Sequence, residues 1–200
     1  VYFNPPAAPL ETALMDELYD LPFSRVPHFS YTDRIPAYDT VKHSIVAMRG
    51  CFGGCTFCSI TEHEGRIIQS RSSESVLREV RALSRMEGFS GVISDLGGPT
   101  ANMYQMRCKD EKIESSCRRL SCVHPGICEN LVTDHDPLVD LMKKVRSAPG
   151  VKKVFIASGV RYDLAERSPE FVKELARHHT GGQLSVAPEH SKKSVLDKMK

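Results

Sequence analysis

Three cysteines with the spacing C-x3-C-x2-C, namely Cys51, Cys55 and Cys58, are the residues of this sequence best suited to chemistry. Thiolates bind zinc and iron–sulfur clusters, and the two glycines between the first two cysteines allow the tight backbone path that brings three thiols to one centre. Three cysteines leave one iron of a four-iron cluster open to a substrate or cofactor, whereas a pure electron carrier normally has four. A zinc loop completed by His63 and three unligated buried cysteines are the alternative interpretations.

Four more cysteines form a second group at Cys108, Cys117, Cys122 and Cys128. Residues 108–128 are too long a loop to be structureless in a compact domain, so we expect something to order them. A second metal site, holding zinc or an auxiliary iron–sulfur cluster, would do so; a set of buried small side chains is the alternative, because no C-x2-C pair is present. We expect this group to be separate from the first, to fold over the same face and to be structural.

Length and composition favour a globular chain and exclude some classes of protein. The 200 residues carry 27 Lys plus Arg against 25 Asp plus Glu, a net charge of +2 that excludes nucleic-acid binding by bulk charge but not through a local patch. No apolar run approaches the roughly 20 residues of a membrane span, so we expect no membrane association. The seven cysteines and the lack of a signal segment favour the cytoplasm, and the missing initial Met suggests a longer parent protein.

Short apolar runs alternate with amphipathic stretches after residue 40, and this order predicts an α/β fold with a parallel sheet. Because right-handed crossovers bring the carboxyl ends of parallel strands to one edge, the unusual residues that follow the strands should meet there. We expect strands over residues 44–48, 91–94, 154–157 and 184–187. We expect helices to begin at Ser72 or Ser73, Asp136, Ser168 and Ser191, and the adjacent His178 and His179 to be a solvated helix end.

The expected domain organisation has two parts and an insert. Residues 1–40 contain an amphipathic stretch and then many prolines, so we expect a lead-in that lies partly extended over a surface and is not core. Residues 41–200 form the core, which we expect to be incomplete at its carboxyl end. Residues 105–130 form a cysteine-rich insert between the second and third strands.

Three long motifs resemble the YgiQ family of the radical S-adenosylmethionine (SAM) superfamily. They are residues 49–60 around the first cysteines, residues 93–104, which read Ile-Ser-Asp-Leu-Gly-Gly-Pro-Thr-Ala-Asn-Met-Tyr, and Ala187-Pro188-Glu189-His190. The likeness covers nearly the whole chain. It implies a partial (β/α) barrel of the radical SAM type, of which about four βα units would be present. An incomplete barrel exposes a strand edge, which predicts marginal stability or association in isolation.

The resemblance implies an enzyme in which Cys51, Cys55 and Cys58 hold a 4Fe-4S cluster whose open iron binds the amino and carboxylate groups of SAM. Reductive cleavage of SAM then gives methionine and a 5′-deoxyadenosyl radical that abstracts hydrogen from a substrate. An electron donor that is flavodoxin- or ferredoxin-like is also implied. The resemblance does not imply which substrate is used, nor whether SAM is consumed or regenerated.

Phe57 would pack near the adenine of SAM, or else be a core aromatic. Gly97 and Gly98 match the place of a Gly-Gly-Glu motif that contacts the SAM amino group, although Pro99 replaces the Glu. Asp95 would partly replace that carboxylate or form a turn. We expect Gly98→Val to block cofactor binding without unfolding the domain, because only a bare backbone allows close approach.

Arg161 would clamp the SAM carboxylate through two parallel hydrogen bonds, or else pair on the surface with Asp163 or Glu166. Ser158 and Glu189 are the candidates for contacts with the ribose hydroxyls. All three candidates follow expected strands, so they should face the cavity that holds the first cysteines.

Two other functions remain open from the sequence. One is a zinc- or cluster-bearing module without catalysis, either structural or binding RNA through Arg66, Arg71, Arg78, Arg81 and Arg85. Glu74 and Glu79 on the same predicted helix favour a solvated face of mixed charge instead. The other is a plain iron–sulfur electron carrier, which the count of three cysteines disfavours.

Overall fold

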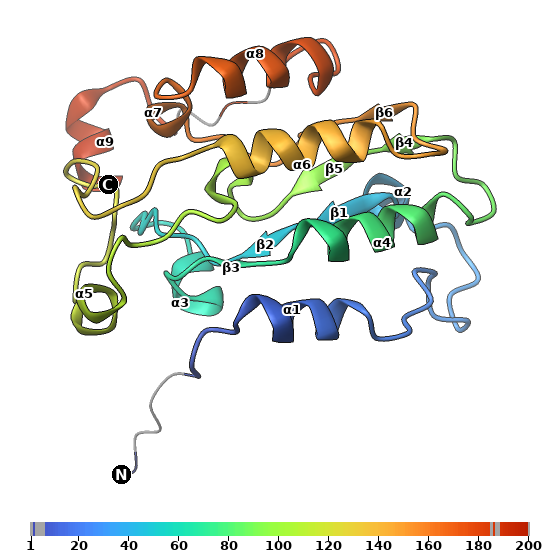
Figure 1. Cartoon of the computed structure of the whole chain (residues 1–200), viewed down its shortest axis with the longest axis horizontal. Helices are drawn as coiled ribbons and strands as arrows, with labels where there is room; N and C mark the ends of the chain where they lie inside the picture. The colour runs from blue at the N-terminus through green and yellow to red at the C-terminus, as the bar shows by residue number, and fades with distance from the viewer. Residues whose placement is uncertain (1, 3–6, 185, 187–188, 200) are drawn as a thin grey trace.

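Short parallel strands form the centre of the molecule, and helices pack around them in the computed structural model, which describes residues 2, 7–184, 186 and 189–199 (Figure 1). β1 (Ser44–Val46) pairs with β5 (Asp95–Gly97), and β4 (Val92–Ile93) pairs with β6 (Lys153–Val154), both in parallel. A hydrogen bond from Leu96 N of β5 to Phe155 O, directly after β6, joins the two pairs. The predicted α/β fold with parallel strands is confirmed, whereas the described strands form three short pairs and not a barrel.

The helices that cover these strands begin close to where the capping residues predict. Ser72 Oγ accepts a hydrogen bond from Ser75 N at 3.0 Å, and Ser168 Oγ accepts one from Phe171 N at 3.3 Å. Asp136, predicted as a cap, is instead the first helical residue. These helices are α4 (Ser73–Leu83), α6 (Asp136–Arg146) and α8 (Pro169–His178). Their buried apolar residues include Val76, Val80, Leu83, Leu141, Met142, Val145 and Leu175.

The first strand is shorter than predicted, and the sheet is not wholly parallel. β1 ends at Val46, and β2 (Met48–Arg49) pairs with β3 (Gln69–Ser70) in antiparallel register. An apolar run shows that a segment is buried but not which strand it pairs with, so the sequence did not reveal this change of partner. The β2–β3 pair closes the base of an excursion that carries the first cysteines and α3 (Ile60–Glu64).

The end of the chain departs from its prediction in two places. Of the fourth predicted strand, Ser185 and Ala187 lie outside the described residues, and Leu184 and Val186 are described but not in a strand. The last helix, α9 (Lys193–Met199), begins after Ser191 as expected. Among the described helices, none is long and apolar enough to cross a bilayer.

His179 is fully buried, so the prediction of a solvated histidine pair was wrong for this residue. Its Nδ1 lies 2.9 Å from Val154 O, and its Nε2 lies 3.1 Å from Glu174 Oε1. Burial lowers the pKa of His179 despite the carboxylate beside it. Its neighbour His178 is exposed, as predicted.

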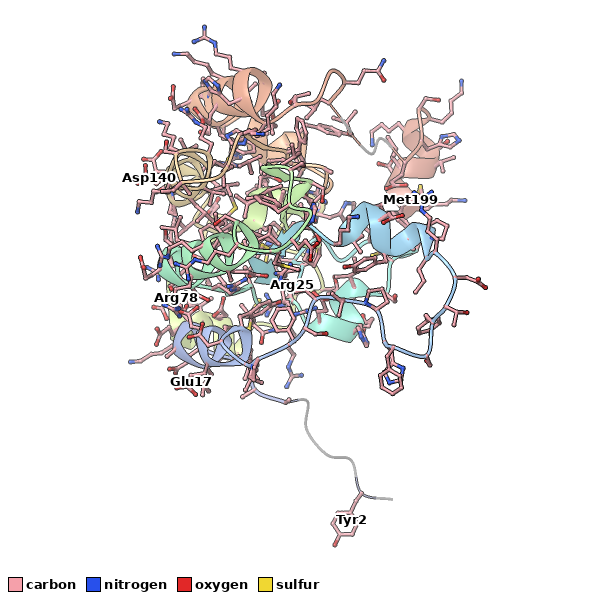
Figure 2. The ribbon with its side chains drawn as sticks, turned by 90° about the vertical axis from the view of Figure 1, so that its right-hand side faces the viewer. Tyr2, Glu17, Arg25, Arg78, Asp140 and Met199 are labelled. Atoms are coloured by element: carbon pink, nitrogen blue, oxygen red, sulfur yellow. The ribbon has the colours of Figure 1, made fainter. Side chains whose placement is uncertain are left out.

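The lead-in packs against the core through specific side chains. Met15 of α1 (Thr12–Tyr19) is buried, and Ser72 N donates to Asp16 Oδ1 at 2.9 Å. Figure 2 shows Arg25 against the body of the molecule, whereas Tyr2 projects away from it. The proline-rich stretch also forms a short helix, α2 (Pro36–Val41), because proline is tolerated in the first turn.

Arg71, one of the predicted RNA contacts, is entirely buried. It pairs with Glu79, donates to Val46 O at 2.9 Å, and stacks 4.0 Å from the centre of the Tyr19 ring. Glu79 pairs with Arg25 as well. Burial lowers the pKa of Arg71 to about 10, so the side chain stays charged at neutral pH.

Two more of these arginines are also neutralised. Arg78 pairs with Asp20 at 2.8 Å, and Arg81 pairs with Glu74 at 2.9 Å. The expected face of mixed charge is therefore present at Arg78 and Arg81, which disfavours the alternative of RNA binding along this helix.

Candidate metal centre

The first cysteines lie on an irregular loop between β2 and α3, and all three are free and half-buried. Cys51 N donates to Gly65 O at 3.0 Å, and Thr61 Oγ1 donates to Cys51 O at 2.9 Å. Cys58 N donates to Cys55 O at 3.2 Å. We call residues 51–58 the cluster loop.

Two of the three sulfurs flank Gly53. A Cβ atom at this position would lie 3.3 Å from Cys51 Sγ, 3.7 Å from Cys55 Sγ and 3.5 Å from Arg161 Nη1. Within the described residues, no three His, Cys, Asp or Glu side chains converge tightly enough to hold a single metal ion. A cubane cluster binds each thiolate at a different corner, so its ligands stand further apart than those of zinc. The described residues therefore contain no preassembled zinc site made by these cysteines and His63.

Electrostatic coupling links these thiols to two of the predicted SAM contacts. Burial raises the pKa of Cys55; Arg161 opposes this effect, and the Cys51 and Cys58 thiols and the Glu189 carboxylate add to it. Burial by itself would lower the pKa of Arg161, but Asp163 and the two nearest thiols outweigh it and raise that pKa. Arg161 Nη1 thus lies beside Gly53 of the cluster loop, whereas a position of Glu189 at the same site stays a prediction.

Arg161 is held by Asp163, which the sequence offered as its alternative partner, and by Asn102, which the sequence did not single out. Its Nε and Nη2 donate to the Asp163 carboxylate at 3.0 and 2.6 Å, so the two parallel hydrogen bonds predicted for a SAM carboxylate are made within the protein. The buried Asn102 bonds both backbone groups of Arg161, each at 2.8 Å. Asn102 Nδ2 also lies 3.3 Å from His135 Nε2. This framework leaves Nη1 beside Gly53.

Gly98 approaches protein backbone, contrary to the expectation that its bare backbone only serves a cofactor. A Cβ at Gly98 would lie 2.5 Å from Met48 O, so Gly98→Val would disturb the fold itself. Gly97 is the last residue of β5 and pairs with Val46 of β1. The prediction that Gly98→Val spares the fold is therefore wrong.

Asp95 joins two strand ends and has no free oxygen to replace the missing Glu of the Gly-Gly-Glu motif. Its Oδ1 accepts from Ala157 N at 2.8 Å and from Ser158 N at 3.0 Å, and the Ser158 hydroxyl donates to Oδ2. The turn interpretation of Asp95 is correct. Ser158 lies at the strand-end edge but uses its hydroxyl proton within the protein.

Phe57 is 52% exposed, which excludes the core alternative. The next residue back, Thr56, anchors the loop to the end of α9: its N–H donates to Met199 O at 3.0 Å and its hydroxyl to Lys198 O at 2.8 Å. Figure 1 shows α3, α5 (Glu111–Ser116) and α9 gathered on one side of the molecule. The exposed ring of Phe57 is thus available to a ligand on this side.

The cysteine-rich insert packs directly on the cluster loop, as expected. Cys122 N donates to Phe52 O at 3.0 Å. Gly54 has φ +63°, and a Cβ there would overlap Leu120 O. A residue other than glycine would be strained in this conformation and would push the insert away.

The chain matches sequence profiles of known proteins over its whole length. The profile described as "Radical SAM superfamily" matches residues 45–200, and the one described as "Radical SAM N-terminal" matches residues 1–44. The chain belongs to the radical SAM superfamily. The members of this superfamily use a 4Fe-4S cluster and SAM, which agrees with the three thiols of the cluster loop.

Relatives confirm the resemblance to the YgiQ family. The chain is 61% identical to a UPF0313 protein of Bradyrhizobium diazoefficiens, 60% to one of Pseudomonas putida and 58% to the UPF0313 protein YgiQ of Salmonella typhimurium. Each match covers 100% of this chain but only 30%, 26% and 28% of the respective relative. The chain thus spans less than a third of the length of these curated relatives.

Proposed function

We propose that this chain forms the part of a radical SAM enzyme in which Cys51, Cys55 and Cys58 hold a 4Fe-4S cluster. The observation that carries this proposal is the position of Cys51 Sγ, Cys55 Sγ and Arg161 Nη1 around Gly53, in a member of the radical SAM superfamily. When bound, the cluster and SAM supply a 5′-deoxyadenosyl radical that abstracts hydrogen from a substrate. The residues of this chain bind and orient both groups.

Arg161 provides a cation beside the thiolates. Because Asp163 engages Nε and Nη2, the guanidinium is fixed in orientation, and Nη1 is the donor directed to a carboxylate or to the anionic cluster. Asn102 positions the backbone of Arg161 and is a positioning residue. Charge and direction are thus set before a ligand arrives, which limits the reorganisation on binding.

The remaining contacts follow from exposure and proximity. Phe57 offers an exposed aromatic face for the adenine, and Glu189 is an exposed carboxylate near Cys55 for the ribose hydroxyls. Gly97 and Gly98 keep the strand end narrow, and Ser158 retains acceptor capacity only, since its proton goes to Asp95. We propose that Asp95 does not replace the missing Glu of the Gly-Gly-Glu motif.

The electron that starts the reaction comes from a flavodoxin- or ferredoxin-like donor in this proposal. The seven free thiols suit the reducing cytoplasm, where they stay available to iron. The substrate stays open.

Anaerobic turnover tests the proposal. The protein, expressed from its complete gene and loaded with cluster, should form 5′-deoxyadenosine and methionine from SAM when a strong reductant is added. Cys51→Ala/Cys55→Ala/Cys58→Ala should form neither product, whereas Ser59→Ala, a change at an exposed neighbour, should behave as the unaltered protein. A loaded, folded protein that leaves SAM intact would refute the proposal.

A further inference from the structure

The four cysteines of the insert, Cys108, Cys117, Cys122 and Cys128, all line one cavity of about 300 Å³. Apolar side chains from the core and the cluster loop form much of its wall, namely Phe52, Ile68, Met106 and Leu131. The volume equals that of roughly ten water molecules in the liquid, which is room for the eight atoms of an iron–sulfur cubane. The proposed function makes no use of this cavity.

Different backbone contacts hold each of the four cysteines in place. Cys108 forms an antiparallel bridge with Leu131. Cys117 follows α5 (Glu111–Ser116), and its N–H donates to Glu114 O at 3.2 Å. Cys122 N bonds the cluster loop, and Cys128 N donates to Cys122 O at 2.8 Å. Four cysteines held at four separate backbone positions therefore line one space, which a set of merely buried small side chains would not require.

Positive charge surrounds this cavity. Arg66 Nη1 donates to Cys122 Sγ at 3.4 Å, and its Nη2 donates to Cys117 O at 3.4 Å. Arg107 and Arg119 also line the cavity, against one carboxylate, that of Glu114. A cubane bound by four thiolates carries a net negative charge, and hydrogen bonds to its sulfurs stabilise it. The charges of the wall match such a ligand.

The cavity contains no preassembled zinc site. A zinc ion needs four donors at about 2.0–2.3 Å from one point. No three such donors converge in this way among the described residues, which include all four cysteines. The four cysteines, the size of the cavity and its positive charge are the features that favour a cluster.

We propose that Cys108, Cys117, Cys122 and Cys128 bind a second 4Fe-4S cluster, one thiolate to each iron. Insertion of a preformed cluster is a ligand exchange: four iron–sulfur bonds to small thiolates break, four bonds to cysteine form, and each departing thiolate leaves with the proton of a cysteine thiol. Iron keeps its oxidation state. With every iron bound to protein, this cluster has no open site and does not bind SAM.

Metal counting on two variants tests the second site independently of the first. The protein is expressed from its complete gene, purified without oxygen and treated with a preformed 4Fe-4S cluster carried by small thiolates. Cys51→Ala/Cys55→Ala/Cys58→Ala should still bind about four iron and four sulfide per chain, and its spectrum should not change with SAM. The fourfold Cys→Ser variant of the insert should bind the same amount, and its spectrum should change. Ser116→Ala, at another residue of the cavity wall, should keep both clusters.

The outcomes separate this proposal from the proposed function. A triple variant that is folded but holds no iron, or holds one zinc ion, overturns the second site whatever the enzyme does with SAM. If the triple variant does not fold, the fourfold variant decides, because its iron should be about half that of the unaltered protein. Equal iron contents of the fourfold variant and the unaltered protein would overturn the proposal. Failure of SAM cleavage alone leaves these counts unaffected.

Discussion

The two cysteine groups lie against each other but are built in opposite ways. The cluster loop carries three thiols within eight residues and has an exposed aromatic ring, a cation and a carboxylate beside it. The insert spreads four half-buried cysteines over residues 108–128, and all four line a cavity whose wall is partly apolar and partly basic. The first arrangement offers three ligands and leaves room for a further one, whereas the second offers four. In the two proposals, one fold therefore holds a cluster with an open iron beside a cluster bound entirely by protein.

The scaffold that carries both groups should be the most sensitive to mutation. Glu79→Ala leaves Arg71 and Arg25 buried without their shared counter-charge, which should lower the free energy of unfolding by about 3–5 kcal/mol. Both groups should then lose iron in parallel, because Arg71 follows β3 at the base of the cluster loop. Urea unfolding and iron content measure this. Glu74→Ala removes an exposed pair and should cost about 0–1 kcal/mol; equal losses in the two variants would contradict the prediction.

A change beside the cluster loop should affect the first cysteine group alone. Arg161→Ala removes the donor beside Gly53 and should weaken SAM binding to the loaded protein roughly 10- to 100-fold, the usual value of a hydrogen bond to a charged group. Total iron should not change. Equilibrium binding of SAM measures the effect, with Arg177→Ala on the exposed face of α8 as the control. Unchanged affinity would remove Arg161 from the SAM site.

A change at the contact between the groups should separate them. Gly54→Ala places a side chain at φ +63° and against Leu120 O, so we expect a loss of about 1–2 kcal/mol in the free energy of unfolding from the backbone conformation alone. Hydrogen exchange should increase in both segments. Gly126→Ala has no atom within 4 Å of the new Cβ and serves as the control in the insert. Equal stability of the two variants would show that the groups are not packed together.

Lowering the pH should destabilise the scaffold that carries both cysteine groups, and it should affect the two groups alike. Burial lowers the pKa of both His135 and His179 below the ordinary 6.5. The unfolded chain therefore binds more protons than the folded chain between the lowered pKa values and 6.5, so the free energy of unfolding should fall as the pH drops through that window. Above pH 6.5, His135 and His179 do not make the free energy of unfolding depend on pH. Urea unfolding at several pH values measures this; His179→Gln should reduce the slope and His178→Gln should not.

The sequence predicted the parts of the molecule that depend on local pattern. The spacing of Cys51, Cys55 and Cys58, the helical periodicity and the caps at Ser72 and Ser168 are all read from neighbouring residues. The position of Arg161 near the cluster loop agrees with the rule that strand ends meet at one edge, since Arg161 comes soon after β6.

Contacts between distant segments were not predictable. Arg71 and His179 are polar residues with polar neighbours in the sequence. Only the folded chain shows that both are buried, Arg71 paired with Glu79 and His179 Nε2 3.1 Å from Glu174 Oε1. Asn102 stood within a recognised motif, but its role depends on a loop that comes 59 residues later. Pairing of Met48 with Ser70 likewise depends on where the chain returns.

The antiparallel β2–β3 pair has a consequence for the order of assembly. It closes the cluster loop through contacts about twenty residues apart in sequence, and such short loops form at low entropic cost and early. Arg161 and Asn102 meet only after the whole insert and β6 have been made. We therefore expect the cluster loop with its three thiols to form first during synthesis and Arg161 to join it last. The growing chain would then present metal ligands well before it can hold a cofactor.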